Sequence, residues 1–269
     1  MIKILAIDLD GTLLDSNEDI SKENINAVHY AIKKGVNVIL CTGRPYSMAK
    51  YCAKKLNIQN DKTIIITNNG SMIQYLKDAS IVLRNGLDKT DVMYWKEKCA
   101  KVDIPITLVD SNYCYEPLEY VSQYESQYSK RSSTRELKMI EFENISSNEI
   151  FDKIVICTEQ ELLDLKTTQL VNNNDTKNYY IVRSEPVLLE ILNNKANKWN
   201  ALKYIANQAG VHDYEIMSIG DQMNDYEMIK HSNVGIAMGN AVNDLKIIAD
   251  YVTDTNINDG VAKAIYKFI

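Results

Sequence analysis

The chain has 269 residues, 45% of them hydrophobic and 25% charged, which is typical of a globular protein with enough residues for one large domain or two smaller ones. Its 30 basic and 36 acidic residues give a net charge of −6, which argues against nucleic acid or an anionic membrane as the main partner. Five scattered cysteines without CxxC spacing, no apolar run near the roughly 18 residues of a membrane span and no signal-peptide layout lead us to expect a cytoplasmic protein.

Short apolar runs alternate with helical patterns in the N-terminal part of the chain. We predict strands at 2–7, 36–41 and 62–67, and helices at 21–35 and 45–58. Strands and helices that follow one another at this rhythm are typical of a parallel, doubly wound α/β sheet.

The same alternation returns near the C-terminus. We predict helices at 197–210, 224–232 and 241–249, and strands at 215–220, 234–238 and 251–253. The two ends of the chain therefore predict one Rossmann-like α/β core with a doubly wound parallel sheet, formed by residues 1–84 and 190–269.

Residues 85–189 differ in character and predict a mixed α+β domain inserted into this core. Helical patterns occur at 88–102 and 159–171, and strand-like runs occur at 106–110, 151–158, 179–184 and 187–192. Residues 111–150 are polar and rich in Tyr and Ser, and their pattern predicts no definite element.

Two aspartates spaced by one residue, Asp8 and Asp10, follow the first predicted strand directly. Residues two apart point to the same side of a strand, so both carboxylates can face the crevice beyond its end, where open parallel sheets bind ligands. Gly11 permits a sharp turn whose backbone N–H groups can hold an anion. An ordinary Asp-Gly turn is the simpler alternative, but the whole DxDGT pattern after an apolar strand favours a functional site.

Two further clusters could bind phosphate. Thr42-Gly43-Arg44-Pro45 ends the second strand and opens a helix, whose free N–H groups and the Thr42 hydroxyl suit an anion, although Thr42 could simply cap the helix. Lys198, near the start of another helix, could hold a phosphate oxygen or offset clustered carboxylates, although a lone lysine is usually a solvated surface residue.

The fourth cluster, GDQMND at 220–225, adds the carboxylates of Asp221 and Asp225 and the amide of Asn224. Four carboxylates at strand ends would raise one another's pKa strongly unless a divalent cation lay between them. The loop of an EF-hand is absent, and oxygen ligands without a nearby set of His or Cys indicate Mg²⁺.

In this order, DLDGT (8–12), TGR (42–44), Lys198 and GDQMND (220–225) resemble the motifs of the haloacid dehalogenase superfamily of phosphotransferases. The insertion of residues 85–189 resembles the large α/β cap of its Cof-like hydrolases, the type IIB subfamily. Further matches are TNNGS (67–71), SEPVLLEIL (184–192), GIAMGNA (235–241) and NDGVAKAI (258–265), so the resemblance spans essentially the whole chain.

The resemblance implies a phosphatase that hydrolyses small phosphomonoesters, sugar phosphates above all, through an aspartyl-phosphate. It implies that Asp8 is the nucleophile and that Asp10 is the general acid and base. The residues that it places on Mg²⁺ are Asp8, Asp10 through its backbone carbonyl, Asp221 and, in support, Asp225. The groups that it places around the transferring phosphoryl are the Leu9 backbone N–H, Thr42, Gly43, Lys198 and Asn224.

Two positions depart from the pattern of the family. Trp199 follows the motif lysine where the family usually has Gly, and Gln222 stands where the family often has Asn. Asn197 supports Lys198 as the motif lysine, and Lys195 is the alternative.

Two other functions remain open on the sequence. A phosphomutase would use the same aspartyl-phosphate, and a non-hydrolytic sensor would only bind a phosphorylated ligand. The expected partner in each case is a small phosphorylated metabolite. Hexose phosphates, a riboflavin-pathway phosphate and pyridoxal phosphate are all candidates.

Overall fold

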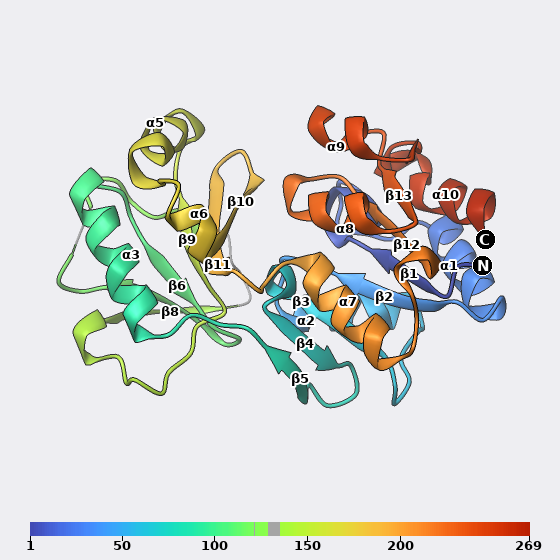
Figure 1. Ribbon diagram of the computed structural model, residues 1–269, viewed down its shortest axis with the longest axis horizontal. Coiled ribbons are helices and arrows are strands. Elements are labelled where there is room, and N and C mark those ends of the chain that lie inside the picture. The colour runs from blue at the N-terminus through green and yellow to red at the C-terminus, as the bar shows by residue number, and fades with distance from the viewer. Residues whose placement is uncertain (121, 129–134) are drawn as a thin grey trace. The chain divides into compact units, whose positions relative to one another are not determined.

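The structure, a computed structural model, describes residues 1–120, 122–128 and 135–269. They divide into two compact units, one of Met1–Leu83 with Asn197–Ile269 and one of Arg84–Ala196 (Figure 1). The chain returns to the first unit after Ala196, which is later than the predicted end of the insertion at residue 189. The reason is that β11 (Leu188–Asn193) pairs with strands on both of its sides in the sheet of the second unit, which keeps the strand there.

The first unit is built on an eight-stranded sheet in the order β14-β13-β12-β1-β2-β3-β4-β5. Its strands are β1 (Ile4–Ile7), β2 (Asn37–Cys41), β3 (Ile64–Thr67), β4 (Met72–Tyr75), β5 (Ile81–Arg84), β12 (Ile216–Gly220), β13 (Val234–Ala237) and β14 (Tyr251–Val252). The pairs from β14 to β3 are parallel, which confirms the predicted α/β fold. The edge differs from the prediction, because β4 runs antiparallel to β3.

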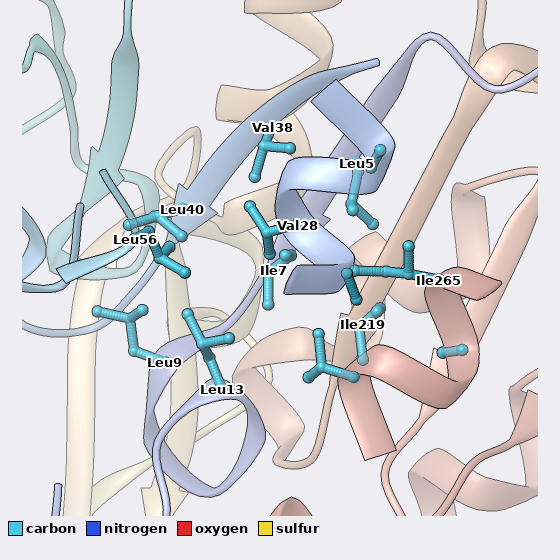
Figure 2. Close-up of a cluster of buried hydrophobic side chains, with 14 of the residues drawn as sticks. Leu5, Ile7, Leu9, Leu13, Val28, Val38, Leu40, Leu56, Ile219 and Ile265 are labelled. Atoms are coloured by element: carbon cyan, nitrogen blue, oxygen red, sulfur yellow. The ribbon is translucent and has the colours of Figure 1, made fainter. Parts of the chain in front are cut away.

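Helices cover both faces of this sheet. The first apolar cluster contains residues of α1 (Lys22–Lys33), α2 (Tyr46–Lys55), α9 (Asn243–Ile248) and α10 (Gly260–Phe268), and the second contains residues of α7 (Lys198–Gln208). The helix α8 (Tyr226–His231) contributes Ile229 to the first cluster and Met228 to the second. Alternate residues of β1 serve the two faces, since Leu5 and Ile7 belong to the first cluster and Ile4 and Ala6 to the second. Figure 2 shows the first cluster, in which strand residues meet Val28 of α1 and Ile265 of α10.

The second unit has a six-stranded sheet in the order β10-β11-β9-β6-β7-β8. Its other strands are β6 (Thr107–Val109), β7 (Tyr113–Pro117), β8 (Glu136–Ile140), β9 (Lys153–Cys157) and β10 (Tyr179–Glu185), and its helices are α3 (Lys89–Val102), α5 (Gln160–Leu170) and α6 (Asp175–Asn178). Both α3 and α5 pack their apolar residues on one face of the sheet. On the opposite face, a buried ion pair joins Lys153 Nζ to Glu190 Oε1 at 2.9 Å.

The strands β7 and β8 lie in the stretch 111–150, for which the sequence predicted no element. Residues 121 and 129–134 of that stretch lie outside the described residues. In the part of the chain that the structure describes, no helix has the length and apolar character needed to cross a membrane.

Candidate active site

The segment after β1 is fixed by its own buried leucines. The backbone N–H of Asp8 donates to Ile219 O of β12 at 3.1 Å, which continues the parallel pairing one residue beyond the strand. Leu9 and Leu13 are fully buried and belong to the first apolar cluster, as Figure 2 shows. The two leucines therefore anchor the tight turn over Leu9–Leu13, and this anchoring sets where Asp8 emerges from the strand.

The turn after β1 packs directly against the loop after β12. Gly11 has a φ of +69°, and a Cβ at this position would lie 2.4 Å from Asp221 Oδ2. The hydroxyl of Thr12 donates to Asp221 Oδ1 at 2.8 Å. Only glycine allows both the left-handed backbone and this close approach, so Gly11 is required for Asp221 to lie beside the turn.

A buried lysine links two of the predicted carboxylates. Lys198 Nζ donates to Asp8 Oδ1 at 2.5 Å and to Asp225 Oδ1 at 2.6 Å. Lys198 is the first residue of α7, and the Asn197 side chain caps this helix by accepting from Asn200 N at 2.7 Å. The structure therefore places Lys198 among the carboxylates.

The alternative lysine, Lys195, is an exposed residue of the second unit. Trp199, which stands where the family usually has Gly, is buried in the apolar cluster between α7, α8 and the sheet. Its ring stacks on that of His231, with centroids 5.5 Å apart. The larger side chain is thus accommodated on the core side of the helix and leaves Lys198 in contact with Asp8 and Asp225.

Three buried aspartates form a candidate metal site. One carboxylate oxygen from each of Asp8, Asp221 and Asp225 can be chosen so that all three lie within 4.8 Å of one another. Asp225 Oδ2 also accepts from the backbone N–H groups of Asp221 and Gln222, at 2.9 and 3.1 Å, which holds this loop in place. Three carboxylates and one ammonium sum to a charge of −2, so the donor set fits a divalent cation that prefers oxygen ligands.

Burial of this cluster shifts the pKa values of its members. Desolvation and the nearby Asp225 carboxylate raise the pKa of Asp8 well above its usual range. The same two causes raise the pKa of Asp221 to about 7. Burial by itself lowers the pKa of the Lys198 ammonium, but the carboxylates of Asp225 and Asp8 outweigh it, so Lys198 stays charged.

Asp10 is held by a different partner. Arg44 Nε donates to Asp10 Oδ2 at 2.8 Å and Arg44 Nη2 donates to Asp10 Oδ1 at 2.5 Å, a two-pronged ion pair. Arg44 Nη2 also donates to Glu18 Oε1 at 2.6 Å. The Asp10 side chain is 50% exposed, so in this structure it lies outside the buried carboxylate cluster that contains Asp8.

Arg44 is a candidate functional residue that the sequence did not single out. Its only sequence signal was its place in the TGR motif, directly after the phosphate-binding candidates Thr42 and Gly43. Because a side chain as long as that of arginine has many rotamers, its spacing from Asp10 along the chain could not reveal their contact.

The predicted phosphate-binding residues Thr42, Gly43 and Asn224 meet around Asn69. Asn224 Nδ2 donates to Asn69 Oδ1 at 3.0 Å, and the backbone N–H of Asn69 donates to Thr42 O at 3.0 Å. A Cβ at Gly43 would lie 3.0 Å from Asn69 Oδ1. The Thr42 hydroxyl accepts from Arg44 N at 3.0 Å.

Asn240 braces the turn after β1. Its Nδ2 donates to Gly11 O at 2.7 Å, and its Oδ1 accepts from Asn256 N at 3.0 Å. These two hydrogen bonds give Asn240 a part in positioning the turn that carries Asp10.

Comparison with known proteins places these features in one family. The haloacid dehalogenase-like hydrolase family matches residues 5–265. The Bacillus subtilis 5-amino-6-(5-phospho-D-ribitylamino)uracil phosphatase YcsE is 32% identical over 269 residues, which cover 100% of this chain and 96% of that protein.

Solved structures give the same result for the fold. A haloacid dehalogenase-like hydrolase from B. subtilis is 26% identical, covers 100% of both chains and superposes with a TM-score of 0.82. The subclass IIB sugar phosphatase BT4131 superposes with a TM-score of 0.79 over 99% of this chain and 98% of its own. The two sequences are 24% identical, so this likeness shows the fold alone.

The carboxylate cluster predicts how stability depends on pH when divalent cations are removed with EDTA. Asp221 has a pKa of about 7 in the folded protein against 3.8 as its ordinary value, so between these values the folded protein binds more protons than the unfolded one. We therefore expect the Tm in EDTA to fall as the pH rises from 5 to 8, measured by differential scanning fluorimetry.

Asp221→Asn removes one titrating carboxyl and should show a smaller fall than the wild type over the same pH range. Added Mg²⁺ should raise the wild-type Tm most at pH 8, where the carboxylates are ionised and able to bind it. Equal slopes for the two proteins in EDTA, with no effect of Mg²⁺, would contradict the metal site.

Proposed function

Because this chain is a phosphatase of the haloacid dehalogenase-like hydrolase family, we propose that it hydrolyses small phosphomonoesters with Mg²⁺ through a phosphorylated Asp8. The observation that carries the proposal is the buried cluster of Asp8, Asp221, Asp225 and Lys198, which combines a nucleophile, a cation-binding donor set and a fixed ammonium. Sugar phosphates and sugar-alcohol phosphates are the proposed substrate class. A relative that is 32% identical is named for a substrate whose phosphate is carried on a ribityl chain.

Asp8 is the proposed nucleophile. Lys198 engages its Oδ1, so we assign the attack on phosphorus to Oδ2. The Oδ2–P bond forms while the bond from phosphorus to the alcohol oxygen breaks, and the alcohol leaves. The Lys198 ammonium fixes the carboxylate and offsets the negative charge that gathers around the transferring phosphoryl.

Asp10 is the proposed general acid and base. In the first step its carboxyl gives a proton to the leaving alcohol oxygen. In the second its carboxylate takes a proton from the water that attacks the phosphorus, the Oδ2–P bond breaks, and inorganic phosphate and the free Asp8 carboxylate are released. The Arg44 guanidinium contacts both oxygens of Asp10 and therefore fixes the plane and position of this group. Arg44 is thus a positioning residue for the acid–base step.

The proposed Mg²⁺ ligands are Asp8, the Asp10 backbone carbonyl and Asp221, with Asp225 in support. When bound, the cation supplies positive charge at a phosphoryl oxygen and offsets the −2 charge of the cluster. Asp225 gives one oxygen to Lys198 and the other to two backbone N–H groups, so its proposed part is to hold Lys198 and the loop that carries Asp221.

The proposed phosphoryl-binding groups are the Leu9 backbone N–H, Thr42, Gly43 and Lys198. Asn224 was predicted to belong with them. Its Nδ2 donates to Asn69 and its Oδ1 is a buried acceptor, which suits a cation or a hydrogen-bond donor better than the oxygen of an ionised phosphate.

Replacement of the nucleophile gives the decisive test. Asp8→Asn keeps an oxygen that can accept from Lys198 but cannot form a stable acyl phosphate, so phosphate release should fall by at least ~10³-fold. The assay measures inorganic phosphate released from a panel of sugar, sugar-alcohol and nucleotide monoesters, with Mg²⁺ and with EDTA.

The matched control is Asp61→Asn, because the Asp61 side chain is 78% exposed and pairs with Lys77 at the surface. This variant should retain the wild-type rate. Release by Asp8→Asn at the wild-type rate would contradict the nucleophile. A folded wild type that is phosphorylated on Asp8 by a bisphosphate activator and then converts one phosphate ester into its isomer, without releasing inorganic phosphate, would instead be a mutase. A wild type that binds phosphate esters without phosphorylation of Asp8 would be a sensor.

The role of Arg44 can be tested through the leaving group. Arg44→Ala should lower kcat/KM for an alkyl phosphate by about 10- to 100-fold, because the poorly leaving alkoxide needs a proton from a correctly placed Asp10. The loss should be much smaller for p-nitrophenyl phosphate, whose leaving group departs without one. Arg44→Lys should be intermediate, since it keeps the charge but loses the two-pronged contact. Equal losses on both substrates would show that Arg44 acts on phosphate binding instead.

A further inference from the structure

We propose that Asn69 is a positioning residue for phosphoryl transfer, because its loop joins the segments that carry Thr42, Lys198 and Asn224. The proposal rests on the phosphatase function proposed above and adds a residue to its machinery. The loop follows β3 and contains Asn68–Gly70, which sit within the first unit together with all of these partners.

The backbone of this loop has an unfavourable conformation. Asn68, Asn69 and Gly70 have φ angles of +49°, +55° and +92°, so three consecutive residues lie in the left-handed region. For residues other than glycine this conformation costs free energy and persists only where the surrounding contacts fix it. Asparagine is among the residues that tolerate it best, because its short polar side chain can form local hydrogen bonds.

The side chain of Asn69 reaches the loop after β12. Asn69 is fully buried, and its Oδ1 accepts from Asn224 Nδ2 at 3.0 Å. Asn224 is itself 9% exposed, and its Oδ1 is buried without a hydrogen-bond partner among the described residues. Because Asn69 takes the donor end of this amide, it leaves the acceptor end for a ligand, and a cation or a donor group suits that end.

The backbone of Asn69 reaches the segment after β2. Its N–H donates to Thr42 O at 3.0 Å, and the preceding residue, Asn68, donates its N–H to Arg44 O at 3.1 Å. Its side chain also lies against Gly43, where an added Cβ would be 3.0 Å from Asn69 Oδ1. These contacts hold both ends of the Thr42–Arg44 segment.

Gly70 brings the same loop against the start of α7. A Cβ on Gly70 would lie 2.2 Å from Asn197 O and 2.9 Å from Lys198 N. The loop backbone can therefore touch the first turn of the helix that carries Lys198 only because residue 70 has no side chain. Together with the two links above, this contact joins segments that are far apart in the sequence.

A double-mutant cycle tests whether Asn69 acts through Asn224. Asn69→Gly keeps the left-handed conformation but removes the hydrogen bond, and Asn224→Ala removes its partner. Each should lower kcat by about 10- to 100-fold, the scale of a misplacement near 1 Å, with a smaller effect on KM. The double variant should be no slower than the slower single variant, because both changes break one contact. Losses that multiply, or no loss in Asn69→Gly, would overturn the proposal.

The matched control is Asn57→Gly. Asn57 is an exposed asparagine with a φ of +52° at the end of α2, so the substitution makes the same chemical change at the same kind of backbone position. This variant should keep the wild-type kcat. Asn69→Asp, which retains an acceptor for Asn224 Nδ2, should retain more activity than Asn69→Gly if the hydrogen bond matters. Equal loss in both would show that the loop needs asparagine for another reason and would overturn the proposal.

Binding of inorganic phosphate separates this inference from the proposed function. With Mg²⁺ present, phosphate should raise the Tm of the wild type and of Asn57→Gly, and this rise should shrink in Asn69→Gly. If the wild type releases no phosphate from any ester but shows this pattern, the phosphatase proposal fails and the positioning of the phosphate site by Asn69 stands. If phosphate stabilises neither the wild type nor the variants, both fail.

Discussion

The site depends on the mutual repulsion of three buried carboxylates that have one ammonium between them. Asp8, Asp221 and Asp225 cannot all ionise in a desolvated position unless positive charge lies close by, and Lys198 supplies only one unit of it. The remaining charge of −2 is what a divalent cation would balance. The raised pKa values of Asp8 and Asp221 express the same imbalance.

Despite this repulsion, contacts with the surrounding strands and turns hold each carboxylate in place. Asp8 continues the parallel pairing of β1 with β12, and the buried Leu9 anchors the turn that follows. Thr12 and the missing side chain of Gly11 hold Asp221, while backbone N–H groups hold Asp225. Because the strands are parallel, their carboxyl ends lie at one edge, and loops distant in the sequence can meet there.

The two proposed reactive aspartates have opposite surroundings. Asp8 is buried beside Lys198, whereas Asp10, two residues later, is half exposed and bound by Arg44. A nucleophile benefits from a fixed, desolvated position, and a group that passes protons to and from water benefits from contact with solvent. The buried Leu9 between them makes this division possible, since its side chain fixes the turn at which the chain changes direction.

The sequence by itself determined the α/β core, because apolar periodicity and strand-end motifs involve residues that are close together along the chain and can be recognised without the structure. It also singled out Asp8, Lys198, Asp221 and Asp225, which the structure brings together. It did not determine the strands β7 and β8, whose half-exposed residues lack a clear alternation, or that the second unit extends to Ala196. Only the tertiary structure decided that Arg44 pairs with Asp10 and that Asn69 joins the loops. Such contacts depend on rotamers, left-handed backbone and the approach of distant segments, none of which leaves a periodic signal in the chain.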